Sequence, residues 1–277
     1  MSSHAYLSPS SSERWISCPP SVKLSEKFQD EVSSYAKEGT EAHALCEHKL
    51  KKLLGLDSKD PTDDLDFYSE EMEECTESYA TYVMEIISRY KGPLVFIEQR
   101  LDLSKFAKES YGTADCIVLA DNEINVVDYK HGQGILVDAH ENTQLMLYGL
   151  GALNLFDGIY DIEKVIMHIY QPRRENISIF EMSTDELYKW TEGVLIPKSK
   201  LAFNGEGDYK SGDWCRFCNA KNICRERANI ALEVARCEFK LPPLLSDEEV
   251  ENALKDVDQI ESWVKDIKEY ALKRALE

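Results

Sequence analysis

The chain has 277 residues and a net charge of −19 at neutral pH, and 43% of its residues are hydrophobic. A chain of this length can bury one large hydrophobic core and still form an accessory region. No apolar run is long enough to span a bilayer, and the N-terminus lacks the basic and apolar segments typical of a signal peptide. We therefore expect a cytoplasmic protein without a membrane segment. Its eight cysteines favour metal binding over disulfides.

Acidic and basic residues are unevenly distributed along the chain. Acidic residues crowd residues 57–77 and the tail from residue 247 onward. The stretch from residue 198 to residue 227 holds four acidic residues, against the basic residues Lys198, Lys200, Lys210, Arg216, Lys221, Arg225 and Arg227. A strong acidic excess is atypical for a DNA-binding protein, but a basic surface can lie on an acidic protein. Charge alone therefore neither supports nor excludes a DNA partner.

The N-terminal third of the chain has helical patterns. Three helical segments are predicted there, at residues 8–26, 37–54 and 70–90. Within the first segment, a Pro-Pro break follows Cys18 and ends a short capped helix. Gly39-Thr40 supplies the start signal of the second segment.

The central region predicts a sheet with helices between its strands. Strands are expected at residues 93–103, 113–120, 123–130, 164–172 and 176–183, and helices at residues 141–156 and 184–203. The order of helix, three strands, helix and two strands predicts an α/β fold with a central mixed sheet flanked by helices.

The stretch "GTADCIVLADNEINVVDYKHG" predicts a β-hairpin with Asp-Asn as a two-residue turn. This turn pairs Ala120 with Glu123 and places Asp115 directly opposite Asp128 on the same face. Lys130 shares the face of Asp128. Two buried carboxylates in this position need a cation or a shared proton. The alternative is three solvated strand-end residues, but we favour a functional group because buried unpaired acids are costly.

Cys215, Cys218 and Cys224 form a closely spaced triple that can bind one metal centre. A fourth ligand must come from elsewhere. The candidates are the six histidines and the cysteines Cys18, Cys46, Cys75, Cys116 and Cys237. Cys18 stands out because it lies in a Ser/Pro-rich loop. The cysteines at positions 46, 75 and 116 fit apolar helix or strand patterns that are typical of buried thiols.

Further candidates lie on the predicted helices before and after the hairpin. Gln144 and Tyr148 are four residues apart and share one helix face. They are either site residues or ordinary, partly exposed helix residues. His43 lies on the earlier helix, and Glu47 shares its face. This leaves open a structural histidine, a site residue or a separate metal-binding pair.

In their order, these motifs resemble those of the RecB-type nucleases of the PD-(D/E)xK superfamily. The closer resemblance is to the iron–sulfur branch that includes CRISPR-associated and phage or prophage exonucleases. It is carried by His43 in "GTEAH", Asp115 in "GTAD", Asp128 and Lys130 in "DYK", Gln144 and Tyr148 in "QLMLY", Cys18 in "SERWISCP" and the downstream cysteine triple. The motifs extend from about residue 8 to residue 227. Each is weak alone, but their order and completeness are specific.

The resemblance implies a restriction-endonuclease-like core with a bound Mg²⁺ or Mn²⁺. His43, Asp115 and Asp128 would bind the ion together with the backbone carbonyl of Tyr129. The ion would acidify a water molecule and offset the charge of the scissile phosphate.

The remaining motif residues would support this chemistry. Lys130 would orient the attacking hydroxide and stabilise charge in the transition state. Gln144 and Tyr148 would hold their helix against the site and contact the DNA backbone. Glu98, in the preceding strand, is a further candidate, which would contact the metal ligands and not the ion itself.

The resemblance also implies that Cys18, Cys215, Cys218 and Cys224 hold one [4Fe–4S] cluster. Zinc is the competing interpretation, because four thiolates suit both. Either centre would close a long loop between the N-terminal and C-terminal segments and so constrain the unfolded chain.

We expect four parts in the chain. They are an N-terminal segment with the first cluster cysteine (residues 1–35), a nuclease core (36–205), a cysteine-cluster region (206–240) and a C-terminal amphipathic helix (241–277). In the helix, Ser246 and Glu249 predict a capping box, and the apolar stripe consists of Val250, Leu254, Val257, Val264 and Ile267. We expect this helix to pack on its own domain, and the alternative is a docking helix for a protein partner.

The motifs and the resemblance together predict a metal-dependent DNA nuclease. We expect an exonuclease that hydrolyses DNA ends or single strands and is related to phage or prophage enzymes. Two alternatives remain. One is a non-catalytic DNA-binding module, against which the intact Asp/Asp/Lys set argues. The other is an interaction protein stapled by zinc.

Overall fold

The computed structural model describes residues 5–28, 33–229 and 247–276, and the chain forms two compact units. Met1–Ser12 and Glu31–Pro197 form the first, the core unit, and Glu13–Asp30 and Lys198–Glu277 form the second, the cysteine unit. The N-terminal segment expected as one part is thus divided between the two units. The cysteine unit combines an N-terminal with a C-terminal segment of the chain.

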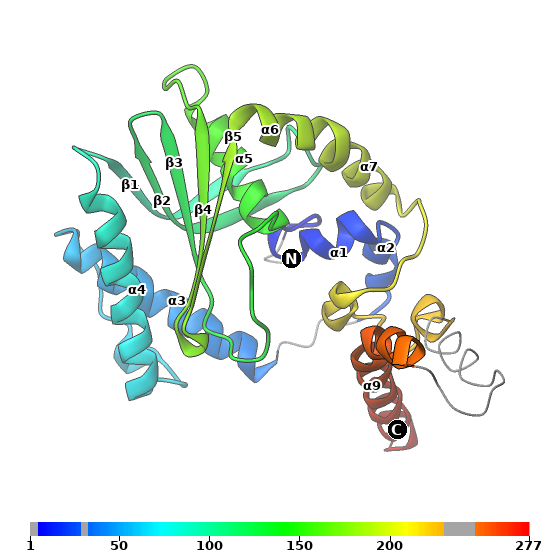
Figure 1. Ribbon diagram of the computed structural model, residues 1–277. Coiled ribbons are helices and arrows are strands. Elements are labelled where there is room, and N and C mark those ends of the chain that lie inside the picture. The colour runs from blue at the N-terminus through cyan, green and yellow to red at the C-terminus, as the bar shows by residue number, and fades with distance from the viewer. Residues whose placement is uncertain (1–4, 29–32, 230–246, 277) are drawn as a thin grey trace. The chain divides into compact units, whose positions relative to one another are not determined.

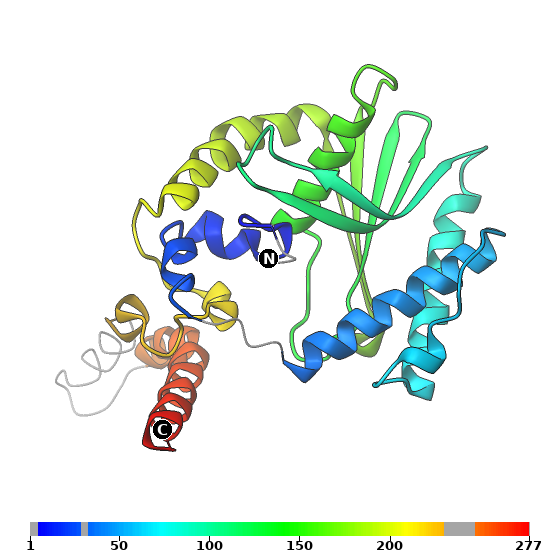
Figure 2. The ribbon, with the colours of Figure 1, turned by 180° about the vertical axis from the view of Figure 1, so that it is seen from behind.

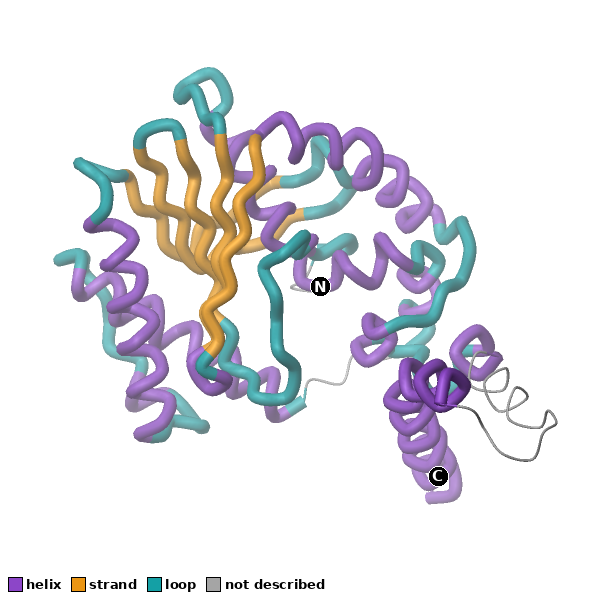
Figure 3. Tube along the Cα trace, in the orientation of Figure 1, coloured by secondary structure: helices purple, strands orange, loops and turns teal. Residues whose placement is uncertain are grey.

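The core unit contains a five-stranded mixed sheet with the strand order β1-β2-β3-β4-β5 (Figures 1 and 3). The strands are β1 (Leu94–Asp102), β2 (Tyr111–Ala120), β3 (Glu123–Tyr129), β4 (Lys164–Gln171) and β5 (Asn176–Ser183). β3 and β4 are parallel, and the other neighbouring pairs are antiparallel. The predicted mixed α/β sheet is therefore confirmed, and all five strands lie within a few residues of their predicted ranges.

α3 (Ser34–Leu53) begins earlier than predicted. Ser33 caps the helix, because its side chain accepts a hydrogen bond from the Ala36 N–H. Gly39 and Thr40, the predicted start signal, lie inside the helix, and the Thr40 hydroxyl donates to the Ala36 carbonyl. The predicted start was wrong because one glycine in a helix costs only about 1 kcal/mol, which an upstream serine cap can offset.

α3 and α4 (Glu70–Ser88) pack side by side over one face of the sheet (Figures 1 and 2). Their buried side chains form a core with Cys116 and Val118 of β2 and with Val127 and Tyr129 of β3. The three cysteines predicted to be core thiols are all buried, namely Cys46, Cys75 and Cys116.

α5 (Thr143–Phe156) connects the parallel strands β3 and β4 and covers the opposite face of the sheet (Figures 1 and 2). Two glycines let its backbone approach the strands closely. A Cβ atom on Gly149 would lie 2.8 Å from Val165 Cγ1, and one on Gly151 would lie 2.9 Å from Leu101 Cβ. This packing fixes α5 against the sheet and thereby positions the side chains of its first turns.

The remaining elements of the core unit are short. They are three 3₁₀ turns, η1 (Pro9–Ser11), η2 (Thr62–Asp64) and η3 (Pro172–Arg174), and the helix α6 (Thr184–Trp190). Ser183 and Glu186 form a capping box at the start of α6. The helix continues through a π-helical turn, η4 (Thr191–Leu195), into α7 (Ile196–Asn204). This agrees with the helix predicted over residues 184–203.

The described elements that lie wholly or mainly in the cysteine unit are α1 (Ser12–Ser17), α2 (Ser21–Ser25), α7, the 3₁₀ turn η5 (Asp213–Phe217) and α9 (Asp247–Leu276). The predicted C-terminal helix is thus confirmed, although its predicted capping box lies outside the described residues. No helix in the described ranges is long and apolar enough to cross a membrane.

α9 contacts its own unit through polar side chains. Asp266 is buried and forms ion pairs with Arg227 and, at 3.4 Å, with Lys221. Ser262 accepts a 2.9 Å hydrogen bond from Arg227. The five residues of the predicted apolar stripe are 37–64% exposed. The helix thus contacts its own unit through its polar side chains, while the stripe residues remain partly exposed in the described part of the chain.

Candidate functional site

The β2–β3 hairpin has the predicted register over most of its length. Ala120 pairs with Glu123, and the ladder continues to Cys116 opposite Val127. Asp121 in the turn adopts a φ of 50°. This is the left-handed conformation that aspartate tolerates better than most residues.

Asp115 lies where the regular pairing of β2 with β3 ends. Its Oδ2 accepts a 2.7 Å hydrogen bond from the Tyr129 N–H. In a regular ladder, Ala114 would lie opposite Tyr129. The side chain thus takes the place of a backbone acceptor. The predicted cross-strand pair of Asp115 with Asp128 does not form within the ladder, although the two acids lie on adjacent strands where this ladder ends.

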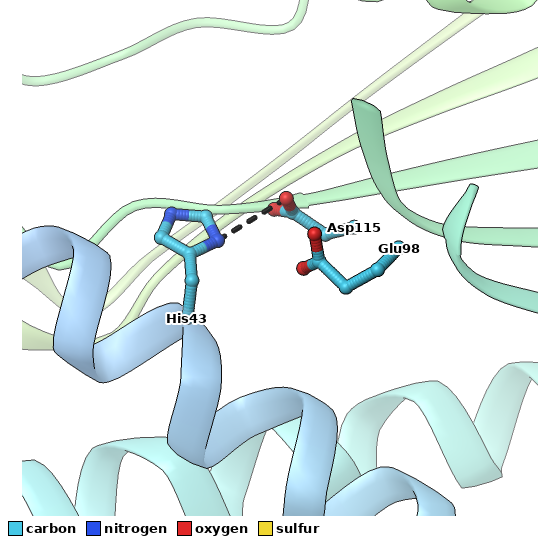
Figure 4. A group of neighbouring side chains, drawn as sticks. All are labelled: His43, Glu98 and Asp115. Atoms are coloured by element: carbon cyan, nitrogen blue, oxygen red, sulfur yellow. Dashed lines mark ion pairs between the residues drawn. The ribbon is translucent and has the colours of Figure 1, made fainter. Parts of the chain in front are cut away.

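His43 of α3 points at Asp115 from the helix (Figure 4). Its Nδ1 lies 3.1 Å from Asp115 Oδ1. Burial opposes protonation of His43, but the neighbouring Asp115 carboxylate outweighs burial and raises the pKa of His43 to about 9. Burial also opposes ionisation of Asp115, but the pKa of Asp115 is lowered by His43 and by the Tyr129 N–H. The pair is therefore an imidazolium–carboxylate pair at neutral pH.

Asp128 and Lys130 form an ion pair on the side of the site that faces α5. Lys130 Nζ lies 2.8 Å from Asp128 Oδ2. Burial raises the pKa of Asp128 even though Lys130 opposes the shift. The pKa of Lys130 is raised because the Asp128 carboxylate outweighs the effect of burial. The two residues thus hold one another in place, as their shared strand face predicted.

Gln144 of α5 connects the ion pair to Tyr148. Its side-chain amide donates 3.2 Å hydrogen bonds to Asp128 Oδ1 and to the Tyr148 hydroxyl. Its carbonyl oxygen accepts a 3.0 Å hydrogen bond from Lys130 Nζ. Asn142 caps α5 by accepting hydrogen bonds at its first turn and thereby fixes the end of the helix that carries Gln144. Gln144 and Tyr148, which were predicted to share one helix face, are thus in contact.

Glu98 of β1 lies in the position opposite Asp115. Ile97 pairs with Cys116 and Gln99 with Ala114, so the register leaves Glu98 between these pairs and across from Asp115. Glu98 has a φ of 48°, which is rare for a residue other than glycine and unexpected inside a strand. Burial, followed by the charge of Asp115, raises the pKa of Glu98 to about 7.

These residues include a set that fits a divalent metal ion. A ring nitrogen of His43 and carboxylate oxygens of Glu98 and Asp115 all lie within 4.8 Å of one another. One nitrogen and several oxygen ligands suit Mn²⁺ and are acceptable for Mg²⁺. Asp128 Oδ2 is buried and, apart from the contact with Lys130, accepts no hydrogen bond from the described residues. It therefore retains acceptor capacity for a cation.

Two further predicted ligands have other surroundings. Glu47 forms a 2.5 Å ion pair with Lys51 and is not part of the metal-binding set, so the structure gives no support to a separate pair of His43 with Glu47. Tyr129 is fully buried, and its ring meets the His43 ring edge-on at 5.6 Å. Its backbone carbonyl remains a predicted ligand.

The four predicted cluster cysteines line one cavity in the cysteine unit. They are Cys18, Cys215, Cys218 and Cys224, and none of them forms a disulfide. Burial first, and then the proximity of Cys215 and Cys218, raise the pKa of Cys18. The cavity thus collects cysteines that are nearly two hundred residues apart in the sequence.

Basic side chains complete the wall of this cavity: Arg14, Lys210, Lys221 and Arg227. Arg14 donates a 3.0 Å hydrogen bond from Nη1 to Ser25, but its buried Nε has no hydrogen-bond partner among the described residues. A buried donor beside four thiols fits a negatively charged group in the cavity. The cavity therefore combines four thiols with basic side chains.

The model of one protein family matches residues 4–277 of the chain, which is nearly its whole length. The family is described as proteins of unknown function and is designated DUF2800. The chain belongs to the DUF2800 family. Among solved structures, the chain is similar to "Crystal structure of SSO0001", with 15% sequence identity and a TM-score of 0.30. This match covers 66% of the present chain and 95% of the other chain.

In this DUF2800 protein, the structure places the predicted site residues in two groups. The core unit brings together six predicted side chains and Glu98, whereas the cysteine unit brings together the four cysteines. Glu98 is the residue whose role sequence reasoning underestimated. Its signal was an acid in the middle of the strand that precedes the hairpin, and the pairing of β1 with β2 places this acid across from Asp115.

Proposed function

We propose that the core unit is a Mg²⁺- or Mn²⁺-dependent deoxyribonuclease with a restriction-endonuclease-like core. One observation carries the proposal. Motif residues from α3, β2, β3 and α5, up to 105 residues apart, form a connected set at one end of the sheet. An acid pair, a lysine and a supporting glutamine have no evident structural reason to converge in this way.

His43, Asp115 and Asp128 would hold the ion, with the Tyr129 backbone carbonyl as a further ligand. The ion would supply positive charge to the scissile phosphate and acidify a water molecule. The side chains present fit this task because the ligand atoms of His43 and Asp115 lie within 4.8 Å of one another, and the buried Asp128 Oδ2 has no hydrogen-bond partner among the described residues apart from its contact with Lys130. Metal binding also requires that His43 lose its proton, so Asp115 would exchange its contact with an imidazolium for a contact with the ion.

Lys130 would act on the reacting groups. Its side chain is 26% exposed, and its ammonium is held by Asp128 and Gln144. From this position it can orient a nucleophile and stabilise the negative charge that develops on the phosphate. Gln144 and Tyr148 would hold α5 against Lys130 and Asp128 and would contact the DNA backbone.

The proposed substrate is DNA with free ends or single strands, and the proposed reaction is exonucleolytic hydrolysis. A relationship to phage or prophage enzymes and a cytoplasmic location are parts of the same proposal. The net charge of −19 disfavours tight non-specific binding to the phosphate backbone, so contacts near the site must supply most of the affinity.

The test uses the full-length protein and DNA oligonucleotides labelled at the 5′ or 3′ end. Single-stranded and double-stranded forms are incubated with Mg²⁺ or Mn²⁺ and analysed for progressive shortening. Lys130→Ala should cleave far more slowly. Lys164→Ala is the matched control, because Lys164 also forms ion pairs on a strand but lies at the turn end of β3 and β4. DNA binding without cleavage under all these conditions would instead support a non-catalytic DNA-binding module.

We further propose that Cys18, Cys215, Cys218 and Cys224 hold a [4Fe–4S] cluster, with zinc as the competing centre. Sulfurs bound to one zinc ion lie within about 4 Å of one another, given Zn–S bonds of about 2.3 Å. Among the described residues, no three of these thiols come within 4.8 Å of one another. This spacing does not match a single zinc ion. A zinc centre would favour the alternative of a zinc-stapled interaction protein.

A further inference from the structure

α9 is a helix of 30 residues in which apolar side chains recur every seven residues (Figure 1). Val250, Val257 and Val264 follow one another at this spacing, and Ile260 and Ile267 repeat it three residues further along. These five residues are called the seam of α9 below. At about 100° per residue, its three valines lie within about 40° of one another on the helix surface. Two apolar positions in each repeat of seven are the pattern by which two helices pack along their length.

The seam lies away from the contacts of α9 with its own unit. Ser262 and Asp266 contact Arg227. They lie about 120–160° round the helix from Val250. The three valines and Ile267 are 37–42% exposed. An apolar face of this kind marks an interaction site on a soluble protein, so within the described ranges the seam remains accessible to a partner.

The charges of α9 favour a second copy of the same helix as this partner. The first half, residues 247–261, holds seven acidic residues and one basic residue. The second half, residues 262–276, holds four basic and two acidic residues. The helix dipole favours such a distribution only in the first and last turns, and Asp258 and Glu261 lie near the middle. Two antiparallel copies would place each acidic half beside the basic half of the other copy.

Two exposed charges beside the seam give this pairing a direction. Glu261 and Lys268 are seven residues apart, so they flank the seam on the same side. Across the described ranges, neither side chain forms an ion pair or a hydrogen bond. In an antiparallel pair this flank faces the same flank of the other helix, so Glu261 of each copy can meet Lys268 of the other. In a parallel pair it faces the opposite flank, and the two residues cannot meet.

We propose that two copies of the protein associate through α9, as an antiparallel helix pair that buries the seam of each. Val264 of each copy lies beside Ile267 of the other, and two symmetric ion pairs of Glu261 with Lys268 flank these contacts. The proposal goes beyond the nuclease function and does not depend on it, because no residue of α9 belongs to the candidate site.

Sedimentation equilibrium of the full-length, anaerobically purified protein tests the association. The mass of the wild type should approach twice that of one chain as the protein concentration rises. Val257→Lys/Val264→Lys should stay at the mass of one chain, because the seam would have to bury four ammonium groups. Leu276→Lys is the matched control and should associate like the wild type. It also replaces an apolar residue of α9, but Leu276 is 81% exposed and lies about 120° round the helix from Val264.

A second variant covers the case in which the double lysine variant does not fold. Glu261→Lys changes one exposed side chain and should leave the circular dichroism spectrum unchanged. It places like charges together twice in the antiparallel pair, so the dissociation constant should rise roughly tenfold. The exchange Glu261→Lys/Lys268→Glu should restore the wild-type value, because each pair then has opposite charges again. An exchange that restores nothing would overturn the antiparallel pairing.

Two results would overturn the association itself. A wild type with the mass of one chain at every concentration would exclude a second copy, and the seam would then be left to another segment of the chain or to a different protein. A pair that persists in a folded Val257→Lys/Val264→Lys variant would show that the copies associate through another surface.

Discussion

Gly112 lies so close to Tyr148 that a Cβ atom added to it would be 2.9 Å from Tyr148 Cε1. The same atom would be 2.7 Å from Pro9 Cγ of the η1 turn. Gly112 opens the "GTAD" stretch that ends with Asp115, and Tyr148 contacts Gln144. The glycine therefore lets α5 approach β2, so that Gln144 reaches Asp128.

Gly112→Ala should disturb both stability and the site. The added methyl group must displace Tyr148 or Pro9, and such overpacking costs about 1–3 kcal/mol. Urea unfolding should show this loss, and DNA cleavage should fall because Gln144 no longer holds Lys130. Gly39→Ala is the matched control, because nothing lies within 4 Å of its added Cβ. That variant should gain up to about 1 kcal/mol, because alanine favours a helix interior.

Asp128→Ala should abolish cleavage without unfolding the protein. Asp128 is a proposed ligand and the partner of Lys130, so its loss removes a ligand and frees the ammonium. Lys130 is partly exposed, so it can turn toward water instead of remaining buried without a partner. Circular dichroism should therefore show a folded protein, and end-labelled DNA should remain intact. Cleavage at the wild-type rate would remove Asp128 from the proposed site.

Lys130→Ala should separate metal binding from catalysis. We expect Mn²⁺ affinity to change little, because the lysine contacts Asp128 Oδ2 and not the His43–Asp115 side. Cleavage at saturating metal should fall by roughly 10²–10³-fold, the loss typical of one removed charge-stabilising group. Calorimetric Mn²⁺ titration beside single-turnover kinetics measures both. If affinity collapses and the rate at saturating metal is unchanged, Lys130 supports the ion and not the reaction.

The fold and much of the site could be predicted because their signals are local. The Asp121-Asn122 turn set the hairpin register, and that register alone placed Asp115 and Asp128 on neighbouring strands, where the β2–β3 ladder ends. Side chains four residues apart on a helix must share a face, so Gln144 and Tyr148 were correctly paired.

Other features depend on contacts that no local pattern shows. The alternation of β1 gave no sign that Glu98 adopts a positive φ, because such a conformation depends on surrounding packing. The Asp115 carboxylate accepts a hydrogen bond from the Tyr129 N–H. This side chain-to-backbone contact stands in place of the predicted cross-strand acid pair. The apolar stripe of α9 had the pattern of a packed helix, but Asp266 makes the contact.

His168 should make the core unit sensitive to mild acid. His168 is 1% exposed and lies between the Tyr82 hydroxyl, 2.8 Å from Nδ1, and Asn125 Oδ1, 3.1 Å from Nε2. Burial, aided by the charge of Arg89, lowers the pKa of His168 to about 4.

In the unfolded chain the histidine pKa is about 6.5, so the unfolded state binds more protons between these two values. Stability should therefore fall as pH drops from about 6.5 to about 4, by about 3 kcal/mol from this group. Urea unfolding at several pH values checks the slope. His168→Gln should be less stable at neutral pH but should have a flatter profile over this range. An unchanged slope in the variant would show that other groups cause the acid sensitivity.

Cys18→Ser should reveal which centre the cysteine unit holds. If the four cysteines hold a [4Fe–4S] cluster, anaerobically purified wild type should be brown, with broad visible absorption that bleaches on reduction. Cys18→Ser should weaken this absorption and lower the melting temperature, because the cluster would tie residues 13–30 to the C-terminal segment of the unit.

Cys75→Ser is the matched control, because Cys75 is a buried thiol of α4 in the core unit. Cys237 cannot serve as the control, because it lies outside the described residues. It should leave colour and iron content unchanged. Colourless, folded protein with stoichiometric zinc would overturn the cluster, and it would leave the site of Asp115, Asp128 and Lys130 intact because that site shares no residue with the cysteine unit.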